Sequence, residues 1–102
     1  REDKGDSGGK GKTNRGKARP PKQGEPNSTY EQIDNETGEV VSRAKYDKNG
    51  RPISREDYYR GSENNRHEHF DKRTGEYLQD HKHIYKYNDK GQRIGEDVVK
   101  LR

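Results

Sequence analysis

The chain contains 102 residues, of which 41% are charged and only 20% are hydrophobic. This composition limits the chain to one small domain with a thin core and excludes a large enzyme with a deep interior. No apolar run is long enough for a membrane span, and no basic stretch leads into an apolar signal segment. The absence of cysteine excludes disulfides and sulfur-ligated zinc. Because the chain starts at Arg1 and contains no Met, we expect it to be a fragment of a longer polypeptide.

The first 27 residues differ from the rest in charge and hydropathy. They hold eight Lys or Arg against four Asp or Glu, which accounts for the whole net charge of +4, and their only apolar residue is Ala18. Such a segment buries too little apolar surface to offset the entropy cost of ordering its backbone. We therefore expect a flexible basic linker over residues 1–27 and a folded domain over residues 28–102. The linker either holds a polyanion through its phosphates or only connects domains.

Four turn signatures divide the folded part into short, half-apolar segments. Each opens with Asp or Asn and supplies Gly late, as in a hairpin loop whose last residue has positive φ. Their repetition predicts a mostly β fold, an antiparallel meander of about five or six short strands. The four signatures are Asp34–Glu39, Asp47–Arg51, Asp71–Glu76 and Asn88–Gln92.

The segments between the turns alternate as strands do. Over residues 40–46, the side chains of Val40, Ser42, Ala44 and Tyr46 fall on one face, and the intervening residues fall on the other. Residues 52–61 are ambiguous, because the sequence from Ser54 to Asp57 resembles a helix capping box and Gly61 could end a helix. We favour a strand or irregular structure there over one short helix.

The histidines are the most informative chemical feature. All four occur in two His-x-His pairs, His67 with His69 and His81 with His83, separated by the third turn. In a strand, each pair presents two imidazoles on one face, but the register of the hairpin decides whether the two pairs meet. Three interpretations stay open: general acid–base catalysis, ligation of a divalent metal, and a His-rich surface strand without catalytic function.

Other polar residues could complete an acid–base site. Glu31 is a candidate acid or base beside His69, His81 and His83. A phosphate that gains charge during cleavage needs cationic donors, for which Arg43, Lys45 and Arg55 are the candidates. Ser28 and Tyr30 could contact a substrate, although Tyr30 is equally suited to the core.

Several of these residues carry a family resemblance. The string GEPNSTYEQID from Gly24 to Asp34, the later Tyr46–Gly50 and His69–Glu76 segments, and the motif His81-Lys82-His83-x-Tyr85 resemble the C-terminal toxin domains of bacterial polymorphic toxin systems. These are the variable tips of contact-dependent inhibition, Rhs, wall-associated and LXG-type proteins. The resemblance covers about residues 10–95. The polar residues that match by position are Ser28, Tyr30, Glu31, Arg43, Arg55, His69, His81 and His83.

The resemblance implies a secreted toxin that is delivered into the cytoplasm of a competing bacterium and neutralised in the producer by a cognate immunity protein. It also implies a metal-independent endoribonuclease that acts on transfer or ribosomal RNA without a cofactor. We therefore expect general acid–base cleavage by His69, His81, His83 and Glu31, RNA and the immunity protein as partners, and no association with membranes. The alternatives are a metal-dependent DNase that uses the His-x-His pairs as ligands and a non-enzymatic hairpin module that binds a partner.

Overall fold

The computed structural model describes residues 12–63, 66 and 68–101, and these residues form an almost entirely β structure. No helix occurs among them, so the mostly β class predicted from the turn signatures is confirmed. The strands are β1 (Lys12–Gly16), β2 (Ser28–Ile33), β3 (Val40–Tyr46), β4 (Pro52–Asp57), β5 (His69–Asp71), β6 (Glu76–Leu78), β7 (His81–Tyr87) and β8 (Arg93–Lys100).

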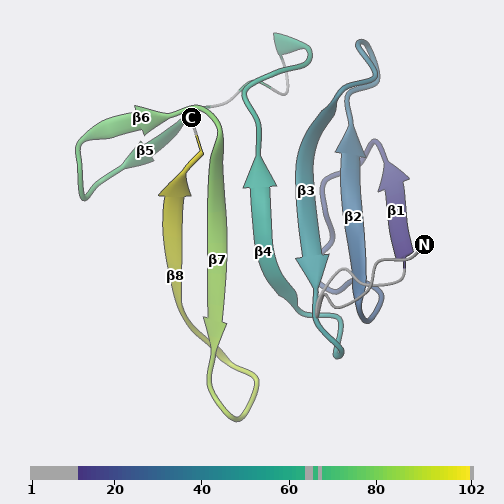
Figure 1. Cartoon of the computed structure of the whole chain (residues 1–102), viewed down its shortest axis with the longest axis vertical. Coiled ribbons are helices and arrows are strands. Elements are labelled where there is room, and N and C mark those ends of the chain that lie inside the picture. The colour runs from purple at the N-terminus through teal and green to yellow at the C-terminus, as the bar shows by residue number, and fades with distance from the viewer. Residues whose placement is uncertain (1–11, 64–65, 67, 102) are drawn as a thin grey trace.

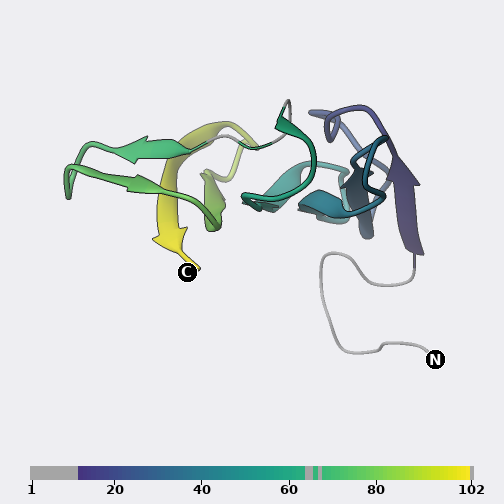
Figure 2. The same ribbon diagram turned by 90° about the horizontal axis from the view of Figure 1, so that it is seen from above.

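Six of the strands form one mixed sheet, and β5 and β6 form a separate hairpin. The order of the large sheet is β1-β2-β3-β4-β7-β8, with β1 parallel to β2 and the remaining neighbours antiparallel (Figure 1). The β5–β6 hairpin lies at the β7–β8 end of this sheet and projects beyond it (Figure 2). The β5–β6 hairpin therefore lies in the sequence between β4 and its sheet partner β7.

The four predicted turns form with the expected chemistry. Gly38, Gly50, Gly75 and Gly91 all have φ between 77° and 80°, a region that costs glycine nothing because it has no Cβ. In each turn the glycine N–H donates to the backbone carbonyl of the opening Asp or Asn at 2.8–3.0 Å. The side chain of the opening residue also accepts a backbone N–H two residues later, for example Asn49 to Asp47 at 2.8 Å. These local bonds determine where each strand of the hairpins ends.

Residues 52–57 form β4, so the strand interpretation of this segment is confirmed and the capping-box helix does not form. Pairing with β3 on one side and β7 on the other satisfies both edges of this strand. A helix would leave those neighbours without partners. Within the described residues, no helix is long and apolar enough to cross a membrane.

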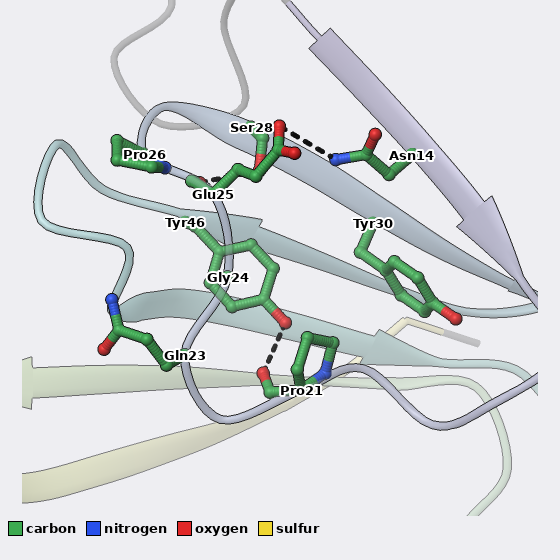
Figure 3. Close-up of a pocket in the computed structure, with 9 residues that line it drawn as sticks. All are labelled: Asn14, Pro21, Gln23, Gly24, Glu25, Pro26, Ser28, Tyr30 and Tyr46. Atoms are coloured by element: carbon green, nitrogen blue, oxygen red, sulfur yellow. Dashed lines mark hydrogen bonds between the residues drawn. The ribbon is translucent and has the colours of Figure 1, made fainter.

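The ordered structure begins earlier than the sequence predicts. Strand β1 lies inside the segment expected to be a linker, and residues 17–27 continue from it along the sheet to β2. Hydroxyl groups hold this segment in place: Tyr30 donates to the carbonyl of Ala18 at 2.9 Å and Tyr46 to that of Pro21 at 2.5 Å (Figure 3). The described fold therefore includes residues 12–27 of the segment expected to be a linker, and hydrogen bonds attach them to the sheet. Residues 1–11 lie outside the described part of the chain.

The core is small and depends on tyrosine. Its buried hydrophobic residues are Val41, Ala44, Tyr46, Tyr58 and Leu78. Tyr46 is 1% exposed, and burial raises its pKa to about 12. Gly24 lies against the ring of Tyr46, since a Cβ there would fall 2.7 Å from the ring atoms. The ring and hydroxyl of Tyr46 thus join the sheet to residues 17–27, which cross the sheet between β1 and β2 and are called here the crossing segment.

Removal of this hydroxyl should loosen the crossing segment. We expect Tyr46→Phe to lower the free energy of unfolding by about 1 kcal/mol, because the partly buried hydrogen bond to the carbonyl of Pro21 is lost. Tyr77→Phe is the matched control, since Tyr77 is 65% exposed and its change should stay within about 0.5 kcal/mol. Urea unfolding measures both values, and equal stability of the two variants would contradict this role of Tyr46.

Candidate functional site

Strand register sorts the candidate residues onto two faces of the large sheet. Neighbouring side chains of a strand point to opposite faces, and directly paired residues of adjacent strands share a face. Asp57 pairs with His81 and Arg55 with His83, so these four residues lie on one face, called here the histidine face. Ser42 pairs with Asp57 and therefore belongs to the same face.

Three imidazoles meet on the histidine face. The ring centroids of His69, His81 and His83 lie 4.9–5.3 Å apart. His81 and His83 come from β7, whereas His69 comes from the β5–β6 hairpin, in which it pairs with Leu78. His67 lies outside the described residues.

The chain bends between β6 and β7, and this bend lets His69 reach the other two rings. In a single strand running from residue 76 to residue 87, the register of Asp71 with Glu76 would place the two His-x-His pairs on opposite faces. Gln79 and Asp80 instead interrupt the strand, and the hairpin forms its own sheet. The carboxylate of Asp80 secures this region by accepting the backbone N–H of Tyr59 at 2.9 Å. The convergence therefore needs no bulge within the hairpin.

The hydrogen bonds of the two β7 histidines determine which nitrogen of each ring is free for chemistry. Nδ1 of His81 lies 2.9 Å from the carbonyl oxygen of Gln79, and Nδ1 of His83 lies 2.6 Å from a carboxylate oxygen of Glu96. A carbonyl only accepts, so Nδ1 of His81 carries a proton; an ionised Glu96 places one on Nδ1 of His83 in the same way. The Nε2 atoms of both rings then face the same carboxylate, that of Asp57.

Asp57 lies at the centre of this arrangement. Its Oδ2 is 3.6 Å from Nε2 of His81, 3.5 Å from Nε2 of His83 and 3.0 Å from Nη2 of Arg55. Its Oδ1 accepts the hydroxyl of Ser42 at 2.8 Å. Burial acts to raise the pKa of Asp57, but His83, Arg55, Ser42 and His81 outweigh it and lower the pKa to about 2. Asp57 is therefore ionised at neutral pH.

Burial also affects the first histidine of β7. His81 is 4% exposed, and its burial lowers its pKa below the usual value despite the opposing effects of the Gln79 carbonyl and Asp57. His81 is therefore neutral at neutral pH, with the proton on Nδ1 and the lone pair on Nε2.

A pocket of about 670 Å³ opens beside the histidines. Its wall includes all three imidazoles and Asp57, together with cations from two different segments. Arg55 belongs to β4 and its side chain is 39% exposed, so it can contact a ligand while it holds Asp57. The other cations, Arg19 and Lys22, come from the segment that crosses the sheet. This pocket can hold an anionic ligand between the imidazoles and these cations.

Glu31 and Arg43 do not join this pocket. Register places Glu31 opposite Arg43, Arg43 opposite Glu56, and Glu56 opposite Lys82, all on the face opposite the histidines. Glu31 there accepts from Arg15 and Arg43, with closest contacts of 2.8 Å to each. The expectation that Glu31 and Arg43 act beside the histidines is therefore not met, because a one-residue offset in a strand reverses the face.

The remaining predicted residues also lie apart from the histidines. Lys45 pairs with Thr29 and Ser54, and so shares the face of Arg43. Ser28 and Tyr30 line a separate pocket of about 430 Å³ (Figure 3). There the hydroxyl of Ser28 donates to the carbonyl of Glu25 at 2.7 Å. The hydroxyls of both residues thus bond to the backbone of the crossing segment, and their role in the structure is to hold it.

Sequence reasoning missed five residues that the structure brings to the site. Asp57 had a usable signal, since a strand over residues 52–57 places it on the face of Arg55. Ser42 and Glu96 gave no signal, because their contacts depend on pairings between distant strands. Arg19 and Lys22 were assigned to the linker, so their position at the pocket could not be expected.

Comparisons with known proteins do not identify the chain. No family model matches it, and neither the search of curated proteins nor the search of solved structures gives a match. The resemblance to polymorphic toxin tips therefore depends on the sequence motifs alone. The geometry of the site has to supply the remaining argument for function.

Paired charges on the face opposite the histidines make the stability of the fold depend on pH. This row, called here the charge ladder, comprises Glu31, Arg43, Glu56 and Lys82. Burial acts to raise the pKa of Glu31, but the hydrogen bonds and charges of Arg15 and Arg43 outweigh it and leave the pKa lowered. At neutral pH we expect Glu31→Gln to lower the free energy of unfolding by about 1–3 kcal/mol, since both arginines lose an ionised partner. The matched control is Glu36→Gln at an exposed position, with a change within about 0.5 kcal/mol.

The sign of the pH effect follows from the lowered pKa. The contribution of Glu31 is fully present above its ordinary value of 4.5 and is lost as the pH falls through the folded-state pKa. The wild-type chain and Glu31→Gln should therefore converge in stability on acidification, as measured by urea unfolding across this range. A difference that stays constant with pH would contradict the role of the ionised carboxylate.

Proposed function

We propose that this chain is an RNA-cleaving toxin domain whose catalytic groups lie in the histidine pocket. The observation that carries the proposal is the convergence of two imidazoles with fixed Nδ1 atoms, whose Nε2 atoms turn toward one carboxylate beside Arg55. Cleavage of RNA through its own 2′-hydroxyl needs a base, an acid and a cation at the phosphate. The pocket contains groups for all three roles.

In this proposal His81 is the base and His83 the acid. The carbonyl of Gln79 keeps the proton of His81 on Nδ1, which leaves Nε2 to accept the proton of the 2′-hydroxyl. The 2′-oxygen then forms a bond to phosphorus as the bond to the 5′-oxygen breaks. His83, whose ring lies between the carboxylates of Glu96 and Asp57, donates an Nε2 proton to the departing 5′-oxygen. The products are a 2′,3′-cyclic phosphate and a 5′-hydroxyl, without consumption of water or metal.

Three cations support binding of the phosphate. Arg55 lies next to the histidines across the β4–β7 pairing, and a guanidinium can bind two phosphate oxygens at once. Arg19 and Lys22 extend the positive charge along the pocket wall. Asp57 holds Arg55 and faces both imidazoles, so we assign it a positioning role for these three side chains. His69 closes the cluster from the hairpin.

Substitution of the histidines tests the chemistry directly. We expect His81→Gln and His83→Gln each to slow RNA cleavage by at least about 100-fold, since each removes a group that transfers a proton. Lys82→Gln is the matched control, because Lys82 lies between them on the opposite face and should retain wild-type rates. Incubation with total RNA, with and without EDTA, and analysis of the product ends measure the effect, while circular dichroism checks the fold.

The outcomes of this assay separate the open interpretations. Cleavage that continues in EDTA and ends in cyclic phosphate supports the proposal. Cleavage of DNA that stops in EDTA would favour the metal-dependent DNase. Intact RNA and DNA would overturn the enzyme and leave a binding module. Loss of activity in the Lys82→Gln variant equal to that in His81→Gln would show that the histidine face is not special.

The toxin and its immunity protein are a proposal based on the sequence resemblance. We expect induced expression of the chain in a bacterial cytoplasm to stop growth and degrade RNA, and co-expression of the neighbouring gene product to restore growth. His83→Gln should be harmless without that partner. Growth curves and total RNA gels give the readout. Equal toxicity of the wild-type chain and His83→Gln would contradict the link between the pocket and toxicity.

A further inference from the structure

The histidine cluster brings nitrogen and carboxylate ligand atoms into one space. Nε2 of His81 and Nε2 of His83 lie 3.6 and 3.5 Å from the same Oδ2 of Asp57, and the contacts of both Nδ1 atoms leave these nitrogens as the ones that can bind an ion. Arg55 contacts the same Oδ2 at 3.0 Å. Three convergent ligand atoms of this kind attract a cation.

The third imidazole completes a metal-binding set. One ligand nitrogen from each of His69, His81 and His83 can be chosen so that all three lie within 4.8 Å of one another. A tetrahedral zinc ion with Zn–N bonds of 2.0–2.1 Å needs ligand atoms about 3.3 Å apart. The two contacts from Asp57, at 3.5 and 3.6 Å, already approach this separation. His69 belongs to the β5–β6 hairpin, which forms its own sheet, so we expect a shift of this hairpin rather than of the large sheet to close the remaining gap.

The outer contacts of the cluster favour the same conclusion. Histidines that bind metals generally donate their second ring N–H to a carboxylate or a backbone carbonyl, which orients the ring. His83 makes this contact with Glu96 and His81 with the carbonyl of Gln79. The ligand nitrogens of both rings are therefore oriented before any ion arrives.

We propose that His69, His81, His83 and Asp57 bind one Zn²⁺ ion in a closed, four-coordinate site that holds the β5–β6 hairpin against the sheet. Zinc accepts imidazole and carboxylate ligands in tetrahedral geometry, and a site with four protein ligands keeps no open position for substrate. The ion thus occupies the nitrogens that would move protons. This inhibitory consequence depends on the cleavage proposed above, whereas the binding itself does not.

Binding is tested on the whole chain in the absence of RNA. We expect calorimetric titration with Zn²⁺ to show one site per chain, Co²⁺ to give the visible absorption of tetrahedral coordination, and saturating Zn²⁺ to raise the Tm by roughly 5–10 °C. His69→Gln should weaken binding at least tenfold while leaving the metal-free Tm close to wild type, since His69 lies on the peripheral hairpin. Absence of Zn²⁺ binding, or equal affinity in His69→Gln, would overturn the site.

A pair of neighbouring carboxylates gives a matched control. Glu96→Gln should lower the Zn²⁺ affinity by about 10- to 100-fold through loss of the contact to His83. Asp97→Asn should leave it unchanged, because Asp97 pairs with Ile84 on the opposite face and contacts Lys86 at 3.0 Å. Equal effects of the two substitutions would contradict the oriented ligand set.

The cleavage assay then distinguishes inhibition from activation. Saturating Zn²⁺ should abolish cleavage of RNA by the wild-type chain, and EDTA should restore it. Zinc that binds and accelerates cleavage would overturn the closed site. If the metal-free chain cleaves no RNA, the proposed function fails, but the titration with Zn²⁺ and Co²⁺ still decides the metal site.

Discussion

The alternation of side chains along paired strands is the constraint on which the site depends. Across β4 and β7, the register brings Arg55 and Asp57 beside His83 and His81, and the same alternation sends Glu56 and Lys82 to the other face. Each inter-strand hydrogen bond that fixes the register therefore also fixes which charges meet. A slip of one residue would exchange the imidazole cluster for the charge ladder.

In this thin sheet, polar contacts supply much of the stabilisation that apolar burial supplies in larger domains. Among the described residues, more polar and charged residues than hydrophobic ones are buried, and Asp34 and Glu31 each accept hydrogen bonds from several donors. An unpaired buried carboxylate would be costly, so each one holds its donors in place. The same networks that stabilise this thin sheet thus orient the residues around the pocket.

The proposed proton transfer and the proposed metal binding both depend on the orientation of the imidazole nitrogens in the cluster. Both need imidazoles whose Nδ1 atoms are fixed as donors and whose Nε2 atoms point into a shared space beside a carboxylate. Arg55 and the cations of the crossing segment favour anionic ligands, whereas Asp57 and His69 complete the ligand set of the proposed zinc site. Under these two proposals, the occupant of the pocket determines whether the rings exchange protons or hold the hairpin.

The sequence by itself determined the β class, the four turns and the placement of the imidazoles of His81 and His83 on one face of a strand. These features are local: turn glycines need positive φ, and alternate residues of a strand share a face. Only the tertiary structure decided that His69 joins His81 and His83, that Glu31 and Arg43 lie on the other face, and that residues 12–27 belong to the fold. Each of these depends on pairings between distant segments, whose register and bends arise from long-range hydrogen bonds rather than from the residues nearby in the chain.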